Sequence, residues 1–392
     1  MERVVIVEAL RTPIGRFLGG LSAIPAPKLA AGLIKEILSR TKIDPGAVDE
    51  VILGNVLQAA VGQNPARQAA IYGGVSPEAG AMTVNKVCGS GMKSVMLATQ
   101  AIRLGDADII LAGGMENMSL APYYLKQART GQRLGHGELV DGMIHDGLWD
   151  CYNDFHMGTT GELVAEKYNV SRKAQDEYAV NSHRKSVRAM AEGDFREEIV
   201  PVSIPQRKGD PIVISADEGP RPDADLAQLG KLKPAFKKDG TVTPGNASTI
   251  NDGAAVLLLM SATKAGELGL NILATIEDYS VGGMEPEWVM MAPVKAVEKL
   301  LGKTSGRIGD FDLIELNEAF SAQAVAVIQE LGMPADRVNV NGGAVALGHP
   351  IGASGARIMV TLIHALRKRG LKRGLATLCL GGGNATAITL SM

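Results

Sequence analysis

The stretch that decides the fold occurs twice in the chain. Its first copy, CGSGMKSVMLATQAIRLGDADIILAGGMEN, runs from Cys88 to Asn117, and its second, GASGARIMVTLIHALRKRGLKRGLATLCLGGGN, from Gly352 to Asn384. Each copy has a small–Ser–Gly turn, a helical segment, a charged turn, a strand and a pair of glycines. The repeat predicts two halves of similar topology.

A second pair of segments repeats in the same order. VDEVILGNV begins at Val48 and DFDLIELNEA at Asp310, and a helix with alanine and glutamine follows each of them. We therefore expect an N-terminal half over residues 1–262 and a C-terminal half over residues 270–392. The hinge between them should lie near Ser261 to Leu270.

Working outward from the repeat, short β-branched runs alternate with longer helical ones, which is typical of the α/β class. We expect strands at residues 3–8, 50–54, 108–113, 254–260, 273–279, 313–316 and 375–380. Helices are expected at residues 26–40, 63–72, 91–104, 171–193, 292–301, 320–331 and 355–369.

Residues 120–248 differ in composition from the rest of the chain. This segment is polar, is rich in Gly, Pro and charge, and has few apolar strands. We interpret it as a loop-rich insertion in the first half, and long excursions of this kind usually form lids or binding surfaces.

Bulk composition excludes several classes of protein. The 392 residues are 46% hydrophobic and carry a net charge of -2, so the basic excess of a nucleic-acid binder is absent. The longest strongly apolar run, Ala254 to Met260, is too short to cross a bilayer, and MERVVIVEALRTP does not resemble a secretory signal. Three widely spaced cysteines do not suggest a disulfide framework or a zinc site. We expect a cytoplasmic enzyme.

Cys88 is the first candidate for chemistry. It lies in NKVCGSGMKSV at an expected strand-to-helix turn, where Gly89 and Gly91 permit a tight turn. The positive end of the following helix should lower the thiol pKa and favour the thiolate. The alternative is a small buried core residue, as most free cysteines are.

Three residues of the second half could complete a site with it. His349 precedes the turn that corresponds to the Cys88 turn, and a Cys–His pair makes a strong sulfur nucleophile. Cys379 ends a strand before GGG, whose N–H groups could face an oxyanion. Asn317, at the end of another strand, could polarise a carbonyl or hold a water. The alternatives are a turn histidine, a core cysteine and a helix N-cap.

Two glycine-rich segments do not indicate a nucleotide site. GSGMKS and GASGAR complete neither G-x-G-x-x-G nor the Walker pattern.

Taken together, the motifs resemble the thiolase family over essentially the whole chain. The blocks are ALRTPIGRF, NKVCGSGMKS, GGMENMS, HMGTTGE, NASTINDGAA, NEAF, GGAVALGHPIGASGAR and CLGGG, in the family's order. HMGTTGE and the segment before it resemble the biosynthetic, acetoacetyl-CoA type. The resemblance implies two duplicated α/β halves in five layers, αβαβα, and no cofactor beyond the coenzyme A substrates.

The resemblance also implies a ping-pong mechanism. Cys88 would be acylated while His349 takes its proton, and Cys379 would exchange a proton with C2 of the second thioester. Asn317 would hold a water that forms one oxyanion hole with His349. The N–H groups of Cys88 and Gly381 would form the other.

Coenzyme A contacts follow from the same resemblance. Ser248 would contact the pantetheine, and Arg221 is the candidate for the nucleotide phosphates. For Arg221, Lys231 and Lys233, a solvated charged face is the alternative. The residues implied to line the acyl end and its tunnel are His156, Met157, Phe236, Ala319 and Phe320.

The chain departs from the family pattern in two places. Thr249 stands where the family usually has glycine, and VMMAPV, through Val294, replaces a G-x-G-P segment. Both changes lie near the expected acyl pocket, so they leave chain-length preference open.

Three rival functions remain. A degradative 3-ketoacyl-CoA thiolase would act on longer chains. A non-catalytic acyl-CoA-binding relative is disfavoured by the presence of all four candidate residues, and a ketoacyl-ACP synthase-like enzyme by the second cysteine. The resemblance implies a homodimer, or a homotetramer if RTGQRLGHG forms an assembly loop. No nucleic-acid or membrane partner is expected.

Overall fold

The computed structural model describes residues 2–392, and its first half is built on a five-stranded part of one large sheet. The strands lie side by side in the order β4-β3-β5-β12-β1, with the short β2 (Gly15–Arg16) paired to β12. Their bounds are β1 (Val4–Arg11), β3 (Glu50–Gly54), β4 (Gly80–Val84), β5 (Ile109–Asn117) and β12 (Asn251–Ser261). The helices are α1 (Ala26–Thr41), α2 (Pro65–Gly73), α3 (Ser90–Leu104) and α7 (Ala262–Glu267).

The second half repeats this order. Its strands run β14-β15-β16-β13, and Val338 pairs in parallel with Ile314 of β14 at the position that β4 takes in the first half. The strands are β13 (Ala274–Gly283), β14 (Leu313–Leu316), β15 (Arg373–Leu380) and β16 (Asn384–Ser391). The helices are α8 (Ala292–Thr304), α9 (Ser321–Glu330), α10 (Ala344–Leu347) and α11 (Ile351–Arg369).

The repeat extends to individual hydrogen bonds. The carboxylate of Asp49, just before β3, accepts the backbone N–H groups of residues 108–109 at 2.8 Å. The carboxylate of Asp312, just before β14, accepts those of residues 372–373 at 2.9 Å. The same aspartate thus fixes the same turn in both halves, and the predicted duplication is confirmed.

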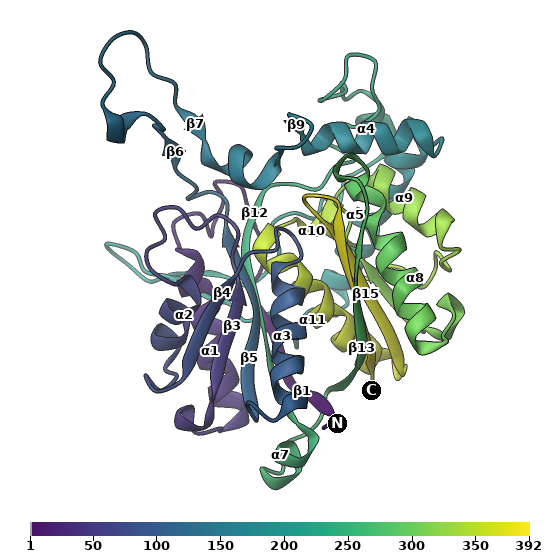
Figure 1. Cartoon of the computed structure of the whole chain (residues 1–392). Helices are drawn as coiled ribbons and strands as arrows, with labels where there is room; N and C mark the ends of the chain where they lie inside the picture. Colours follow the sequence, from purple (N-terminus) through teal and green to yellow (C-terminus); the bar gives the residue numbers. More distant parts are fainter. Residues whose placement is uncertain (1) are drawn as a thin grey trace.

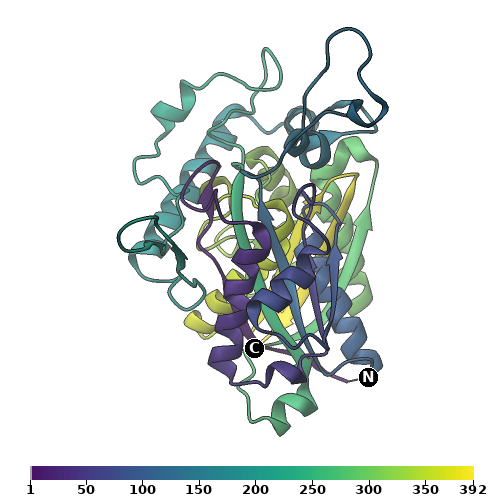
Figure 2. The same cartoon turned by 90° about the vertical axis from the view of Figure 1, so that its left-hand side faces the viewer.

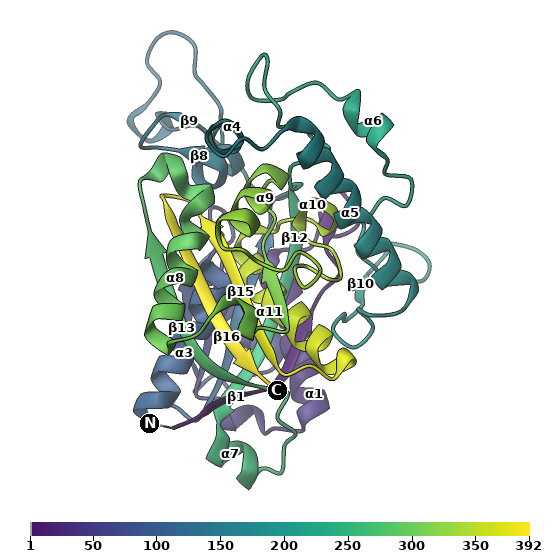
Figure 3. The same cartoon turned by 90° about the vertical axis from the view of Figure 1, so that its right-hand side faces the viewer.

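The elements stack in five layers, as expected (Figure 1). Helices α1 and α2 cover the outer face of the first half, which Figure 2 shows from that side, and α8 and α9 cover the outer face of the second, which Figure 3 shows. Helices α3 and α11 lie between the sheet halves in an apolar core. The two halves of the sheet join where Val5 and Ile6 of β1 pair with Thr275 and Ala274 of β13.

The two central helices touch at their N-terminal turns, backbone to backbone. A Cβ atom on Gly91 of α3 would lie 2.9 Å from the backbone nitrogen of Ala356, and one on Gly355 of α11 would lie 2.6 Å from that of Met92. Only glycine fits at either position without a shift of the chain. The N-terminal ends of α3 and α11 therefore converge in the middle of the molecule.

The insertion crosses the top of the molecule in Figure 1, and a long loop between β6 and β7 projects away from it. Two of its helices, α4 and α5, pack on the body, and only α5 was expected from the sequence. Its elements are β6 (Tyr123–Tyr124), β7 (Val140–Asp141), the π-helix η3 (Ile144–Leu148), β8 (Trp149–Asp150), β9 (Phe155–His156), α4 (Met157–Lys167), α5 (Arg172–Ala191), β10 (Val202–Ile204), β11 (Ile212–Ile214) and α6 (Leu226–Gly230).

Within residues 2–392, none of the helices has the length and apolar character needed to cross a membrane.

Candidate active site

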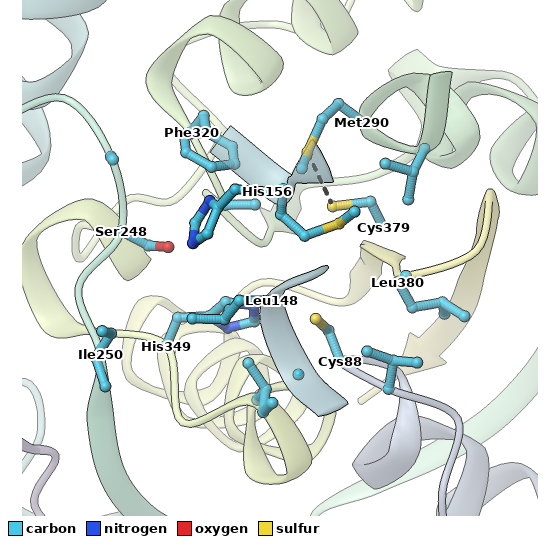
Figure 4. Close-up of a pocket in the computed structure, with 18 of the residues that line it drawn as sticks. Cys88, Leu148, His156, Ser248, Ile250, Met290, Phe320, His349, Cys379 and Leu380 are labelled. Carbon is cyan, nitrogen blue, oxygen red and sulfur yellow. Dashed lines mark hydrogen bonds between the residues drawn. The ribbon is translucent and has the colours of Figure 1, made fainter. Parts of the chain in front are cut away.

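A cavity of about 260 Å³ lies above the N-terminal ends of α3 and α11, beneath the insertion. Both halves and the insertion contribute to its wall. Cys88, His349 and Cys379 all line it, and Figure 4 shows their side chains directed into the same space. His349 and Cys379, which are 261 and 291 positions from Cys88 in the chain, therefore meet it in one cavity.

Cys88 sits on a strained turn between β4 and α3. Val87, just before it, has a φ of 47°, a left-handed conformation that a β-branched residue rarely adopts. The side chain of Ser90 holds the turn closed, because it donates to the Val87 carbonyl at 2.6 Å and accepts from the Lys86 N–H at 2.8 Å. The turn projects the thiol into the cavity.

The prediction that the helix end lowers the pKa of this thiol is wrong. Burial raises the pKa of Cys88 to about 12, although hydrogen bonds from the Gly381 N–H and from its own N–H act in the opposite direction. The negative charge of Glu116 raises it further. Desolvation thus outweighs the two N–H hydrogen bonds, and Cys88 rests as a neutral thiol that needs a base to become a nucleophile.

His349 can be that base. Its backbone N–H donates to Asn251 Oδ1 at 2.9 Å, and its Nδ1 lies 2.6 Å from Ser354 Oγ. The Ser354 hydroxyl donates its one proton to the Pro350 carbonyl at 2.9 Å, so in this hydrogen-bond network Nδ1–H of His349 is the donor to Ser354. The Nε2 atom is then left without a proton.

The environment also keeps this imidazole neutral. Burial lowers the pKa of His349 to about 3, and the positive charge of Arg357 contributes to the shift. At neutral pH the site therefore holds a neutral thiol and a neutral imidazole, rather than a thiolate–imidazolium pair.

Cys379 lies at the end of β15 with only 3% of its surface exposed. Burial and the neighbouring Cys88 sulfur raise the pKa of its thiol, so it also rests protonated. One strand away, Asn317 follows β14 and donates its N–H to the Thr377 carbonyl at 3.0 Å. Among residues 2–392 its buried side-chain oxygen and nitrogen have no hydrogen-bond partner, so both can still bind a polar group.

Aromatic side chains form part of the cavity wall. His156 stacks on Phe236 with ring centroids 4.9 Å apart, and Phe320 meets Phe236 edge-on at 6.4 Å. Gly158 makes room for this stack, because a Cβ there would lie 2.3 Å from the Phe236 ring. Met157 and Ala319 also line the cavity, so every residue expected at the acyl end is present in its wall.

A second cavity, of about 360 Å³, shares part of its lining with the first. Ser248 and Thr249 contribute to both cavities, and Ser248 is held by its N–H bond to the Ala319 carbonyl at 3.0 Å. Arg221 and Arg16 line the second cavity. The other cations considered in the sequence, Lys231 and Lys233, do not contribute to its lining.

Comparison with known proteins gives the family. The family models described as the thiolase N-terminal domain and the thiolase C-terminal domain match residues 4–263 and 270–392. The chain belongs to the thiolase family. An acetyl-CoA acetyltransferase of Pseudomonas aeruginosa is 56% identical to this thiolase, with 100% of both chains covered. A probable acetyl-CoA acyltransferase of Staphylococcus aureus is 54% identical over 100% of this chain and 99% of its own.

The fold is also closely similar to that of a solved relative. The crystal structure of the Bacillus anthracis acetyl-CoA acetyltransferase aligns with this thiolase at a TM-score of 0.98 and 46% identity, covering 100% of this chain and 99% of the other.

Several residues that build the thiolase site carry no signal of their own in the sequence. Ser354 and Asn251 hold His349 from different elements, and Arg16 reaches the second cavity from near the N-terminus. Thr249, which stands where the family usually has glycine, belongs to the same network, because its hydroxyl donates to Asn251 Oδ1 at 2.8 Å. No trio of His, Cys, Asp or Glu within residues 2–392 is placed to hold a metal ion.

Proposed function

We propose that this thiolase is an acetyl-CoA C-acetyltransferase that cleaves acetoacetyl-CoA with coenzyme A and, in reverse, condenses two acetyl-CoA molecules. The observation that carries the proposal is the meeting of Cys88, His349 and Cys379 in one cavity. Two thiols and a neutral imidazole are the groups needed for one acyl transfer and one proton exchange at carbon.

In the cleavage direction, Cys88 attacks the C3 carbonyl of acetoacetyl-CoA and its proton passes to Nε2 of His349. The C2–C3 bond then breaks, and the acetyl-CoA enolate takes the proton of Cys379. The acetyl group remains on Cys88 as a thioester. The raised pKa of Cys379 suits this step, because the thiol still holds a proton at neutral pH.

The second half-reaction restores both thiols. Cys379, now a thiolate, takes the proton of coenzyme A, whose sulfur attacks acetyl-Cys88 and leaves as acetyl-CoA. The Cys88 thiolate regains its proton from His349. Condensation follows the same steps in reverse, and the cell's concentrations of the two thioesters set the direction.

Backbone donors are available for the charges that develop. The N–H groups of Cys88 and Gly381 both face the Cys88 sulfur, where they would bind the oxyanion of the tetrahedral intermediate. Asn317, with its unpaired side-chain atoms, would hold the water that binds the enolate oxygen with His349.

We place the coenzyme A molecule across both cavities. Ser248 lies where they meet and would contact the pantetheine, while Arg221 and Arg16 would bind the phosphates in the second cavity. Coenzyme A is a substrate here, and the proposed chemistry requires no resident cofactor.

The experiment is to incubate the protein with acetyl-labelled acetyl-CoA and to map the labelled residue. We expect the label on Cys88 in the native chain and none in Cys88→Ala, which should still bind coenzyme A. A label on another residue, or turnover by Cys88→Ala, would contradict the mechanism. Equal or faster cleavage of a long-chain 3-ketoacyl-CoA would favour the broader degradative alternative. Coenzyme A binding without turnover would favour the non-catalytic one.

We further propose a homodimer, or a dimer of dimers, acting in the cytoplasm. The edge strand β4 and the adjoining α2 expose Met82, Ile71 and Tyr72, and the loop between β6 and β7 exposes Leu134 almost completely. Apolar groups of this kind suit contacts between copies. The cytoplasm would keep Cys88 and Cys379 reduced, as the mechanism requires. Light scattering of the native chain, and of a variant without residues 128–138, tests whether the loop makes a tetramer.

A further inference from the structure

One side chain lies directly beside Cys379 and has no part in the proposed mechanism. The sulfur of Met290 is 3.9 Å from the Cys379 sulfur, and both residues line the cavity. In Figure 4, Met290 and Cys88 lie on opposite sides of Cys379. Met290 therefore bounds the cavity near the proton-exchanging thiol, rather than near the acyl-carrying one.

The position of Met290 is fixed by its surroundings. It belongs to the 3-10 helix η4 (Pro286–Met291), and only 4% of its surface is exposed. Just before η4, the Met284 N–H donates to the Gly383 carbonyl at 2.8 Å, which ties this segment to the turn after Cys379. On the other side the residue packs in the core formed by α8, α9 and β15. This hydrogen bond and this packing therefore hold Met290 in place as part of the cavity wall.

The chemistry of Cys379 determines what this wall can select. Cys379 gives a proton to C2 or takes one from it, so C2 must come into contact with the Cys379 sulfur. A substituent on C2 then needs space beside that sulfur, and Met290 occupies part of it. Carbons beyond C4 instead extend from C3, which is bonded to Cys88 during transfer.

We propose that Met290 excludes substituents on C2, so that the preferred substrates are 3-ketoacyl-CoA thioesters unbranched at that carbon. This inference rests on the proposed function. It assigns substrate selection at C2 to a residue of the VMMAPV segment, one of the two places where the chain departs from the family pattern.

The test compares cleavage of acetoacetyl-CoA, 2-methylacetoacetyl-CoA and 3-ketohexanoyl-CoA by the native enzyme and by Met290→Ala. Native enzyme should favour acetoacetyl-CoA over the 2-methyl compound. In Met290→Ala, the ratio of kcat/KM for 2-methylacetoacetyl-CoA to that for acetoacetyl-CoA should rise at least about tenfold, the usual effect of one methyl group in an apolar pocket. The ratio for 3-ketohexanoyl-CoA should change much less.

Two variants serve as controls. Met291→Ala removes an equally buried methionine of the same 3-10 helix that does not contribute to the cavity lining, and it should leave all ratios unchanged. Met290→Leu keeps the bulk and should keep the exclusion. Equal cleavage of acetoacetyl-CoA and 2-methylacetoacetyl-CoA by native enzyme would overturn the inference. So would an equal rise of the kcat/KM ratios for 2-methylacetoacetyl-CoA and 3-ketohexanoyl-CoA in Met290→Ala. A rise of the 2-methylacetoacetyl-CoA ratio in Met291→Ala as large as that in Met290→Ala would overturn it as well. Failure of native enzyme to cleave acetoacetyl-CoA would instead refute the proposed function.

Discussion

If His349 is the base that accepts the Cys88 proton, replacing Ser354 should slow catalysis. Ser354 is a positioning residue, since it does not contribute to the cavity lining and holds the imidazole through one 2.6 Å hydrogen bond to Nδ1. In Ser354→Ala, the Nδ1–H group loses its partner in a buried site. The ring then bears an unpaired donor, or it shifts its proton to Nε2 and cannot act as the base.

The size of the effect follows from that lost bond. Leaving a buried donor unpaired costs about 1–3 kcal/mol. If this cost falls on the step in which His349 takes the proton, kcat should drop about 5- to 160-fold. The KM for acetoacetyl-CoA should stay within about twofold of the native value, because the substrate surface is intact.

The assay measures steady-state cleavage of acetoacetyl-CoA and, separately, single-turnover acetylation of Cys88 by acetyl-CoA. Both rates should fall together, since His349 acts before the carbon–carbon bond breaks. Ser94→Ala is the matched control. Ser94 is buried in α3, and its hydroxyl donates to the carbonyl four residues earlier, as that of Ser354 does in α11. Native kcat in Ser354→Ala, or an equal loss in Ser94→Ala, would refute the role of Ser354.

Three further predictions concern packing, charge and pH. Gly158→Ala places a Cβ 2.3 Å from an aromatic ring, so thermal unfolding should show a loss of about 1–3 kcal/mol and the KM should rise, whereas Gly32→Ala, in open space on α1, should do neither. Arg221→Ala should raise the KM for coenzyme A at low salt more than Lys231→Ala does, and equal effects would contradict phosphate binding in the second cavity. Between pH about 3 and about 6.5, unfolded chains bind a proton at His349 and folded chains do not, so stability falls as pH falls through this window. Urea unfolding should show native protein losing about 2 kcal/mol more than His349→Gln between pH 7.5 and pH 5; parallel profiles would contradict a neutral buried imidazole.

Much of the fold was predictable because local pattern and tertiary structure agree. The strands at Glu50–Gly54 and Leu313–Leu316 have the expected bounds, since β-branched and apolar residues are buried there between turns. Two of the longer strands of the large sheet were missed, β4 and β16; β4, Gly80–Val84, is a half-exposed edge with a weak apolar pattern. Helix α4 was missed because it begins MGTTGE, in which glycine and threonine have low helix propensity, and because its N-cap is a histidine, His156, rather than Ser, Thr, Asp or Asn.

The site was predictable where the repeat carried the information. It placed His349 with Cys88 although nothing local connects them, whereas Cys379 was expected there from the family resemblance; the cavity contains all three. The pKa of Cys88 was not predictable in the same way. A helix end is visible in the sequence, but burial depends on how the second half and the insertion cover the thiol. The roles assigned to individual residues and the division near residues 262–270 remain predictions.

The glycine contact between α3 and α11 has the form of a self-complementary interface. Gly91 meets Ala356, and Gly355 meets Met92, as the same patch does on both subunits of a twofold symmetric dimer. In these terms the chain is a dimer of related halves fused into one polypeptide. Two halves within one polypeptide need not be identical, and here Cys88 has only glycine at its counterpart, Gly352, while the two sulfurs come from different positions of the repeat. A symmetric pair would have carried two identical groups, whereas the fused pair offers one sulfur to hold the acyl group and another to move the proton.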